Sequence, residues 1–290
     1  MIKKVVVTGS LAYDHIMSMP GKFSDHIMPD KIHLLNVSFI IDKFRSEYGG
    51  TAGNISYSLS LLRTPNVLVS TAGVDFAPYL KHLKKQKWID LSGIKIYKDV
   101  PTAQGFVTTD KNDNQIWGFY EGAMKKAKSL SLKKILTNNT LLIISPNNPE
   151  AMIKHANEAI SSRTPYLFDP AFNIPHFDAK DLKKIIKNSK ILIGNDYEIE
   201  LISRRLKLTK EDLIKICEII ITTLGENGSI IQRGKEKWII PPARPANESD
   251  PTGAGDAYRA GFIAGYVQGV SLDICGRMGS VAASYTVEKY

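Results

Sequence analysis

The sequence contains few cysteines and no long apolar run. Only Cys217 and Cys275 occur in 290 residues, and neither has a spacing typical of metal ligands. We therefore expect no disulfide framework and two buried thiols in a reducing compartment. The N-terminal stretch MIKKVVVTGSLAYDH lacks a signal-peptide cleavage pattern, and runs such as IIITTL at 219–224 are too short to span a bilayer. These absences predict a cytoplasmic protein without a membrane segment.

The composition also lacks any low-complexity or linker-like stretch. A hydrophobic fraction of 43% and a charged fraction of 23% are ordinary for a folded globular chain. The net charge of +9 raises the question of nucleic-acid binding. However, the lysines are scattered over KHLKKQK, KKAKSLSLKK and KDLKKIIKNSK, which are typical of solvated faces of separate helices. We therefore predict no nucleic-acid partner and a surface that attracts small anionic substrates.

Short runs rich in Val, Ile and Leu alternate with segments of helical spacing. The runs KKVVVTG, NVLVSTAG, TLLIISP, PYLFDP, KILIGND and IIITTLG are bounded by Gly, Pro, Asn or Asp, which is typical of strands buried on both faces. Between them, NISYSLSLLR places Ile55, Leu59 and Leu62 on one helical stripe. The alternation predicts an α/β fold with a mainly parallel central sheet and helices on both faces.

Two regions interrupt this alternation. Residues 13–48 and 97–121 show apolar and polar positions in turn around stretches such as DKNDN, a pattern that indicates β-hairpins. We predict that they form a small discontinuous β lid over a core of 1–12, 49–96 and 122–290. Such a lid excludes water from a substrate. Its exposed strand edges are compatible with a monomer or with a homodimer formed through the lid.

Polar and glycine-rich loops follow the first predicted strand and precede the first long helix. Ligands of open parallel sheets bind beyond the carboxyl ends of the strands. Ser10 and Asp14 stand in GSLAYD, where a carboxylate can hold a sugar diol, although a turn with an exposed Asp is the preferred explanation from these residues alone. In YGGTAGN, Gly49 and Gly50 permit close backbone approach and Asn54 offers a donor and an acceptor, but a flexible helix entry is the alternative.

Two further loops suit the phosphate end of a nucleotide. Asn195 and Glu198 in ILIGNDYE are hard oxygen ligands of the kind that Mg²⁺ prefers, and helix capping is the competing interpretation. In TTLGENGS, Thr223, Gly225 and Gly228 lie between two predicted strands, as in a turn that embraces a nucleotide. A plain hairpin with an Asn-Gly turn fits the same letters. The sequence leaves both pairs of alternatives open.

The stretch TGAGDAYRAGFIAGY carries the strongest signal. If its helix begins near Gly253, the backbone N–H groups of Gly253, Ala254 and Gly255 form an anion hole at the positive helix end. No Gly-Lys-Ser/Thr follows, so the stretch is not a P-loop. A carboxylate beside a phosphate site is explained if Asp256 removes the proton of an attacking hydroxyl. The alternative is an Asp favoured in the first turn of any helix.

Four motifs together carry a family resemblance. YGGTAGN, NDYE, TTLGENG and DPTGAGDAYRAGF occur in the order and spacing of the ribokinase-like, or PfkB, carbohydrate kinases, and the resemblance covers nearly the whole chain. Within that family, GSLAYDHIMSMPGKF, NVSFIIDKF, GFYEGAM and DPTGAGDAYRAGF are most similar to stretches of bacterial adenosine kinases. The resemblance implies a ribokinase-like three-layer core and transfer of the γ-phosphoryl group of ATP to the 5′-hydroxyl of adenosine.

The resemblance also implies roles for individual positions. Asp256 matches the general base of the family, and the three residues before it match the anion hole. The positions that hold the nucleoside correspond here to Ser10, Asp14, Ser38, Gly49, Gly50 and Asn54.

Nucleotide and cation sites follow from the same comparison of motifs. ATP is the implied phosphoryl donor and Mg²⁺ the implied divalent metal, with K⁺ as a further cation in many members. The matching positions are Asn195, Thr223, Leu224, Gly225, Glu226, Asn227 and Gly228 for ATP, Asn195 and Glu198 for Mg²⁺ through water, and Asp250 and Thr252 for K⁺.

The predicted base-binding residues depart from the adenosine kinase pattern. Phe119 in GFYEGAM fits a stacking aromatic, but the second expected aromatic aligns at Gly105, with Phe106 beside it. After FDP, Phe172 and Asn173 stand where similar kinases often carry glutamines that approach the base. We predict contacts from Phe106, Phe119, Phe172 and Asn173. Cytidine, guanosine or inosine as acceptor, a sugar kinase, and a catalytically silent nucleotide-binding protein remain alternatives.

Overall fold

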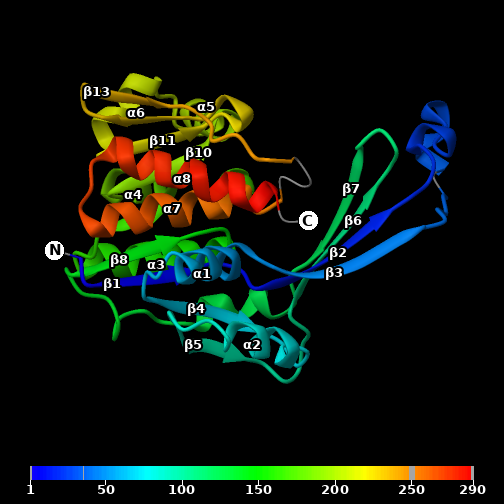
Figure 1. Cartoon of the computed structure of the whole chain (residues 1–290), viewed down its shortest axis with the longest axis horizontal. Helices are drawn as coiled ribbons and strands as arrows, with labels where there is room; N and C mark the ends of the chain where they lie inside the picture. Colours follow the sequence, from blue (N-terminus) through cyan, green and yellow to red (C-terminus); the bar gives the residue numbers. More distant parts are fainter. Residues whose placement is uncertain (1, 35, 248–251, 289–290) are drawn as a thin grey trace.

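A nine-stranded sheet forms the centre of the molecule (Figure 1). The computed structural model describes residues 2–34, 36–247 and 252–288. The strands from β1 to β11 in this sheet pair in parallel, and β12 and β13 complete one edge in antiparallel pairs. In spatial order the strands are β13 (Glu236–Ile240), β12 (Ser229–Arg233), β11 (Ile219–Thr223), β10 (Ile191–Asn195), β9 (Tyr166–Phe168), β8 (Thr140–Ile144), β1 (Lys4–Thr8), β4 (Asn66–Ala72) and β5 (Ile89–Ile96).

Each face of this sheet has its own hydrophobic core. Successive side chains of a strand point to opposite faces, so Val5 and Val7 of β1 pack in one core and Val6 packs in the other. Leu141 and Leu142 of β8 divide in the same way. This explains why the strands read as continuous apolar runs, and it confirms the prediction of a sheet that is buried on both sides.

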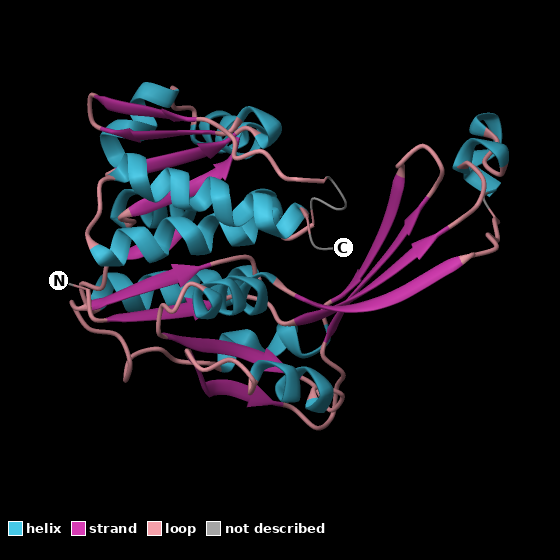
Figure 2. Ribbon diagram, viewed as in Figure 1, coloured by secondary structure: helices cyan, strands magenta, loops and turns pink. Residues whose placement is uncertain are grey.

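Helices cover both faces and complete three layers (Figure 2). Helices that contribute residues to the Val5 core are α1 (Thr51–Leu61), α2 (Ala77–Leu83), α7 (Ala254–Gln268) and α8 (Leu272–Val287). Helices that contribute residues to the Val6 core are α3 (Pro149–Ser161), α4 (Ala179–Asn188), α5 (Asp196–Leu206) and α6 (Lys210–Ile216). Short 3₁₀ segments are η3 (Gly122–Ser129), η4 (Ala171–His176) and η5 (Gly225–Asn227).

The end of α1 differs from the predicted apolar stripe. Ile55 and Leu59 are fully buried, whereas Leu62 is 37% exposed. The helix ends at Leu61 and Leu62 forms its C-cap, so Leu62 no longer follows the helical period. The predicted stripe is therefore correct over two of its three positions.

A second, four-stranded sheet projects from one end of the core (Figure 1). We call it the small sheet. Strand β2 lies at its centre, antiparallel to β3 and parallel to β6, and two 3₁₀ segments lie between β2 and β3. The strands are β3 (Lys43–Gly49), β2 (Ala12–Ser18), β6 (Ala103–Thr109) and β7 (Gln115–Tyr120), and the 3₁₀ segments are η1 (Phe23–Asp25) and η2 (Pro29–Leu34).

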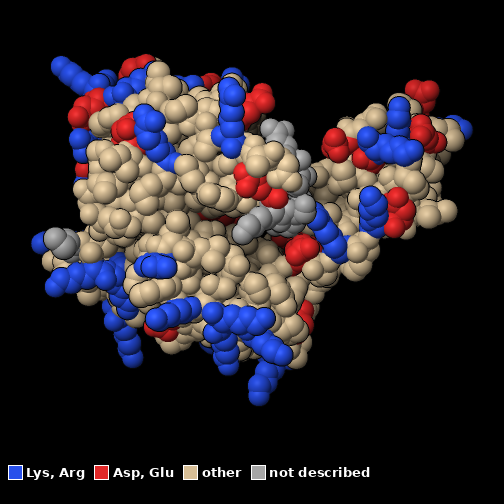
Figure 3. All heavy atoms as spheres, in the orientation of Figure 1, with Lys and Arg blue, Asp and Glu red and all other residues tan. Residues whose placement is uncertain are grey.

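The surface carries its positive charge in a dispersed form. Figure 3 shows Lys and Arg side chains spread around the periphery of the face in view, with Asp and Glu among them, rather than in one stripe. In the part of the chain that the structure describes, no helix combines the length and the apolar character needed to cross a membrane.

The difference in burial between Leu142 and Leu61 predicts unequal costs for removing their side chains. Leu142 is fully buried in β8, whereas Leu61 is 60% exposed at the end of α1. Leu142→Ala is expected to lower the free energy of unfolding by about 2–5 kcal/mol, because it leaves a cavity in a close-packed interior. Leu61→Ala is the matched control and should cost less than about 1 kcal/mol. Urea unfolding followed by circular dichroism measures both, and equal midpoints for the two variants would contradict this assignment of the core.

Candidate active site

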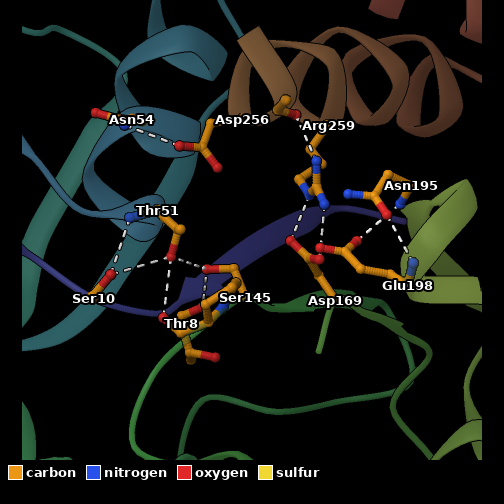
Figure 4. A network of polar contacts seen from close by, with 12 residues as sticks. Thr8, Ser10, Thr51, Asn54, Ser145, Asp169, Asn195, Glu198, Asp256 and Arg259 are labelled. Atoms are coloured by element: carbon orange, nitrogen blue, oxygen red, sulfur yellow. Dashed lines mark hydrogen bonds and ion pairs between the residues drawn. The ribbon is translucent and has the colours of Figure 1, made fainter. Parts of the chain in front are cut away.

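The candidate site lies where the direction of the strand order reverses. From β1 the chain proceeds to β4 and β5 on one side, and it later places β8, β9, β10 and β11 on the other side. In open α/β sheets, ligands bind beyond the carboxyl ends of strands at such a reversal. Residues that follow β1, β8, β9 and β10 therefore surround one region (Figure 4).

A chain of hydroxyl groups joins the ends of β1 and β8 to the start of α1. The Thr51 backbone N–H donates to Ser10 Oγ at 3.1 Å, and Thr51 Oγ1 lies 3.0 Å from Ser145 Oγ. Ser145 Oγ donates in turn to the Thr8 carbonyl at 2.8 Å (Figure 4). Ser10 thus holds the first turn of α1, and a contact of Ser10 with substrate remains a prediction. The sequence analysis missed Thr51 and Ser145, since a single hydroxyl in a loop carries no distinctive signal.

Asp14 occupies a space that two glycines leave open. A Cβ on Gly49 would lie 1.9 Å from Asp14 Oδ2, and one on Gly105 would lie 2.8 Å from Asp14 Oδ1. Burial raises the pKa of Asp14 to about 6, with a smaller increase from Glu47 and a decrease from His15. Among the described residues, none donates a hydrogen bond to the Asp14 carboxylate. The carboxylate can therefore accept hydrogen bonds from a ligand.

The Gly-Gly turn brings β3 into α1 through a conformation that favours glycine. Gly50 has φ +87°, and a Cβ there would lie 2.7 Å from the Ala12 nitrogen. Substitution at Gly50 is therefore strained both by backbone conformation and by space. One turn into α1, Asn54 Nδ2 donates to Asp256 Oδ2 at 2.9 Å. Residues about 200 positions apart in the sequence are thus in direct contact.

The first turn of α7 carries backbone N–H groups that have no carbonyl partner within the described part of this helix. Gly253 is the N-cap in the left-handed region, with φ +80°. The first N–H bonded within the helix is that of Ala257, which donates to the Gly253 carbonyl at 3.0 Å. The N–H groups of Ala254, Gly255 and Asp256 precede this bond and lie at the positive end of the helix. This geometry suits an anion.

Asp256 lies in an environment that disfavours its ionised form. Its pKa is raised to about 6, mainly because burial removes the carboxylate from water. Arg259 and the hydrogen bond from Asn54 lower the pKa, whereas the nearby carboxylates of Asp169 and Asp14 raise it. A carboxylate that titrates near neutral pH suits a general base better than an ordinary aspartate does.

A buried ion pair that the sequence analysis missed lies beside Asp256. The Arg259 guanidinium binds both carboxylate oxygens of Asp169, with Nη2 2.8 Å from Oδ1. Arg259 Nη1 donates to the Gly255 carbonyl at 2.8 Å (Figure 4). Asp169 is 1% exposed and Arg259 is 8% exposed. The available signal was an Arg three residues after Asp256 inside an otherwise small and apolar helix.

Asn195 and Glu198 form the cap of α5. The Asn195 side chain accepts from the Glu198 N–H at 2.7 Å, and Glu198 Oε2 accepts from the Asn195 N–H at 2.8 Å. This is the capping interpretation that the sequence had left open. Burial and then Asp169 raise the pKa of Glu198.

The N-terminus of α5 offers few side chains that could bind a metal ion. Across residues 2–34, 36–247 and 252–288, no cluster of three or more His, Cys, Asp or Glu forms a metal cage. Mg²⁺ commonly binds through one or two carboxylates, waters and the phosphates of a substrate. Asn195 and Glu198 fit a magnesium ion of that kind, and their part in binding it stays a prediction.

The loop between β11 and β12 is a hairpin. Thr223 pairs with Ser229 in antiparallel register, and the connection is 224–228. A Cβ on Gly228 would lie 2.1 Å from the Ile240 carbonyl oxygen, and φ there is +84°, so glycine is required by the fold itself. Binding of a nucleotide by this turn remains a prediction.

The placement of Phe106 corrects one expectation. Asp14 pairs with Gly105 and Gly105 pairs with Phe119, so these three lie on one face of the small sheet. Phe106 points to the opposite face and stacks on His15 with ring centroids 4.8 Å apart. Phe106 and Phe119 therefore do not enclose one base within a single chain. The reason is the two-residue period of a strand, which separates neighbours in sequence.

Asn173 is also corrected, whereas Phe172 remains a candidate. Phe172 is 65% exposed after β9. Asn173 is 3% exposed and its Nδ2 donates to the Asn147 carbonyl at 3.0 Å, so this side chain supports the loop after β8. Both residues lie in η4, whose first residue, Ala171, has φ +42°.

Ser38 does not approach the other predicted residues. Ser18 pairs with Lys43 at the outer end of the β2–β3 ladder, and Ser38 lies in the connection beyond that end. Asp14 lies four residues further inward along β2, or roughly 13 Å at the usual rise of a strand. In this arrangement of the chain Ser38 lies in the outer connection of the small sheet, and its contact with substrate stays a prediction.

The predicted monovalent cation site extends beyond the described residues. Thr252 is exposed at the entry to α7. Asp250, its expected partner, lies outside the described residues, so the K⁺ site stays a prediction.

Comparison with known proteins agrees with the fold and the motifs. The pattern of the pfkB family carbohydrate kinases matches residues 3–290. Nucleoside kinase of Methanocaldococcus jannaschii is 32% identical over 291 residues, which cover 99% of this chain and 91% of the relative. Cytidine kinase of Thermococcus kodakarensis is 26% identical, covering 83% of this chain and 88% of the relative.

Solved structures give the same result. Burkholderia thailandensis nucleoside kinase in complex with inosine superposes with a TM-score of 0.89 at 31% identity, covering 99% of this chain and 93% of that chain. The chain belongs to the pfkB family of carbohydrate kinases and has the ribokinase-like fold. It is thus a kinase of the ribokinase family, a phosphotransferase with an alcohol group as acceptor.

The raised pKa of Asp256 predicts a pH dependence of stability. Between the ordinary value of 3.8 and the folded value of about 6, the folded protein holds this proton more tightly than the unfolded chain. The Asp256 contribution to stability is therefore favourable at low pH and is lost as the pH rises through this window. Asp256→Asn should remove this pH dependence. The melting temperature of the variant, relative to that of wild type, should therefore rise from about pH 4 to about pH 6.5. A difference that stays constant over this range contradicts the assignment.

Proposed function

We propose that this chain is an ATP-dependent nucleoside kinase that phosphorylates the 5′-hydroxyl of its acceptor. The observation that carries the proposal is the position of Asp256. It lies at the positive end of α7 and accepts a hydrogen bond from Asn54. A proton acceptor and an anion hole within one helical turn suit transfer of a phosphoryl group to a hydroxyl. The names of the similar proteins support a nucleoside as the acceptor.

Asp256 acts as the general base in this mechanism. Above about pH 6 its carboxylate is ionised and accepts the proton of the acceptor hydroxyl. The hydroxyl oxygen forms a bond to the γ-phosphorus while the bond from that phosphorus to the β–γ bridging oxygen breaks. The N–H groups of Gly253, Ala254 and Gly255 stabilise the charge on the transferred group. The Asn54 amide holds Asp256 toward the acceptor.

Asp14 holds the acceptor through its ribose. A carboxylate without a hydrogen-bond partner among the described residues, with two glycines cleared around it, can accept both hydroxyls of a diol. A diol on Asp14 and a reacting hydroxyl on Asp256 match the two ends of a ribose. Gly50 allows the backbone to approach the same group closely.

The phosphoryl donor lies toward α5 and the β11–β12 turn. Residues 223–228 and Asn195 would contact ATP. A magnesium ion held by Asn195 and Glu198 would neutralise part of the phosphate charge. A structure of the Burkholderia thailandensis nucleoside kinase in complex with ADP-inosine supports this use of the fold. Potassium at Asp250 and Thr252 would add a cation near the anion hole.

The acceptor that we place first is adenosine, with inosine, guanosine and cytidine as the alternatives. Phe119 on the Asp14 face of the small sheet and exposed Phe172 after β9 supply aromatic surface for a base. With Asn173 bonded to the Asn147 carbonyl, fewer polar groups select among bases than the sequence predicted. We therefore expect broader acceptor use than that of a dedicated adenosine kinase.

The small sheet acts as a lid in this proposal. It carries Asp14 and Phe119 and projects from the core beside the strand ends (Figure 1). Its closure over the acceptor would exclude water and thus limit hydrolysis of ATP. Pairing of two chains through their lids, or a monomer, fits this role.

A coupled ADP-release assay with Mg-ATP tests the proposal. The panel contains adenosine, inosine, guanosine, cytidine, ribose and fructose, and nucleosides are expected to turn over well above the two sugars. Turnover of sugars without turnover of nucleosides would favour the sugar kinase alternative. Absence of turnover together with tight ATP binding would favour a silent nucleotide-binding protein.

Asp256→Asn should separate binding from catalysis. The amide keeps the shape but accepts no proton, so kcat is expected to fall by about 10²–10⁴-fold while nucleoside and ATP binding persist. Isothermal titration and steady-state kinetics measure the two effects. Asp181→Asn, in the first turn of α4, is the matched control and should leave kcat unchanged. A kcat within a few-fold of wild type for Asp256→Asn would sink the mechanism.

Gly49→Ala should disturb Asp14 without removing it. The added Cβ would meet Asp14 Oδ2 at 1.9 Å and displace the carboxylate. We expect KM for the nucleoside to rise by about tenfold or more, the effect of losing a good hydrogen-bonded contact. Gly118→Ala in the same small sheet is the control, since no atom lies within 4 Å of its added Cβ. Equal KM values for the two variants would remove Asp14 from the ribose site.

A further inference from the structure

We propose that Arg259 and Asp169 are a positioning pair that holds the first turn of α7, and with it Asp256, against the carboxyl end of β9. The inference rests on the proposed function for its kinetic consequence. Its structural part concerns the folded chain alone. Neither residue is assigned to contact the acceptor or the phosphoryl donor.

Three hydrogen bonds give the pair its geometry. Nε and Nη2 of Arg259 bind the two oxygens of Asp169, and Nη1 binds the carbonyl of Gly255. Gly255 immediately precedes Asp256 and belongs to the anion hole. One planar guanidinium therefore joins the turn that carries the base to the strand end after β9. Lysine lacks the fork needed to make these three bonds at once.

The surroundings of Arg259 explain why a cation is buried there. Asp169 at the end of β9 and Asp256 on α7 both interact with it, and Glu198 on α5 is a third carboxylate nearby. Asp14 from β2 and Tyr79 from α2 also face Asp256. In this group of acids, Arg259 lowers the pKa of Asp256 while Asp169 raises it.

The opposite effects of Arg259 and Asp169 on the pKa of Asp256 distinguish this pair from an ordinary structural ion pair. A structural pair lowers stability when either member is lost, because the other charge remains buried and unpaired. A pair that faces Asp256 also moves the acid limb of the pH profile, in a direction that depends on which member is lost. Arg259→Gln should move the limb of kcat to higher pH, and Asp169→Asn should move it to lower pH.

The kinetic experiment uses the full chain and whichever nucleoside the wild type phosphorylates. For Arg259→Gln we expect kcat to fall by about 10- to 100-fold, as for a small misplacement of a catalytic group. KM for the nucleoside should change less than threefold, because Asp14 and Gly50 stay in place. Arg259→Lys should keep the acid limb near its wild-type position while kcat stays reduced, since it keeps the charge and loses the fork.

The double variant Asp169→Asn/Arg259→Gln tests the coupling and guards against unfolding. Removing both charges leaves neither buried alone, so it should melt at or above the lower of the two single variants. Its acid limb should lie between those of the single variants. A loss of stability in the double variant equal to the sum of the losses in the two single variants would contradict a paired role.

A matched pair on the surface serves as control. Arg277 binds Asp273 with the same fork on α8, with Nε at 3.0 Å and Nη2 at 3.4 Å from the carboxylate oxygens. Both side chains are exposed there. Arg277→Gln and Asp273→Asn should leave kcat and the acid limb unchanged.

A measurement that requires no activity separates this inference from the proposed function. Hydrogen exchange by mass spectrometry should show faster exchange over residues 254–262 of α7 in Arg259→Gln and in Asp169→Asn, and no change in Arg277→Gln. Failure of the wild type to phosphorylate any nucleoside would refute the proposed function and leave this result standing. Unchanged exchange in α7, or acid limbs that shift in the same direction in both single variants, would overturn the positioning pair.

Discussion

The parallel pairing of β1 with β4 on one side and with β8 on the other is the constraint on which the rest of the molecule depends. It makes β1 a central strand, and the helices on both faces of the sheet bury its side chains in two cores. The strand order also reverses at β1, with β4 and β5 on one side and β8 to β11 on the other. In such sheets the carboxyl ends of the strands at the reversal are open to a ligand. Ser10, Ser145 and Asp169 follow three of these ends.

Helix α7 supplies the other half of the site, and its burial creates an electrostatic problem. Its positive end favours anions, yet Asp256 is half-buried near other carboxylates, and its pKa rises accordingly. Asn54 and Arg259 offset part of this cost through a hydrogen bond and a charge. A carboxylate with a pKa of about 6 results from the balance. The same environment ties stability to pH, because protonation of Asp256 favours the folded state, whereas the proposed role as a general base needs its ionised form.

The small sheet shows how a period of two divides neighbouring residues. Gly105 and Phe119 share a face with Asp14, and Phe106 belongs to the other face with His15. Glycine at 105 leaves the space that the Asp14 carboxylate occupies. An aromatic side chain at 105 would therefore compete with Asp14 for room. This accounts for the departure of the sequence from the pattern of two stacking aromatics.

Much of the fold was predictable from the sequence, because local forces act on residues that are near one another in the chain. The six apolar runs are strands, the fold class is confirmed, and the helix of TGAGDAYRAGF begins with its glycines and Asp256 in the first turn. Contacts over long separations were decided only in three dimensions. Asn54 reaches Asp256 and Arg259 reaches Asp169 across 202 and 90 positions. No local pattern encodes such distances, since the packing of α1 and α7 on the sheet sets them.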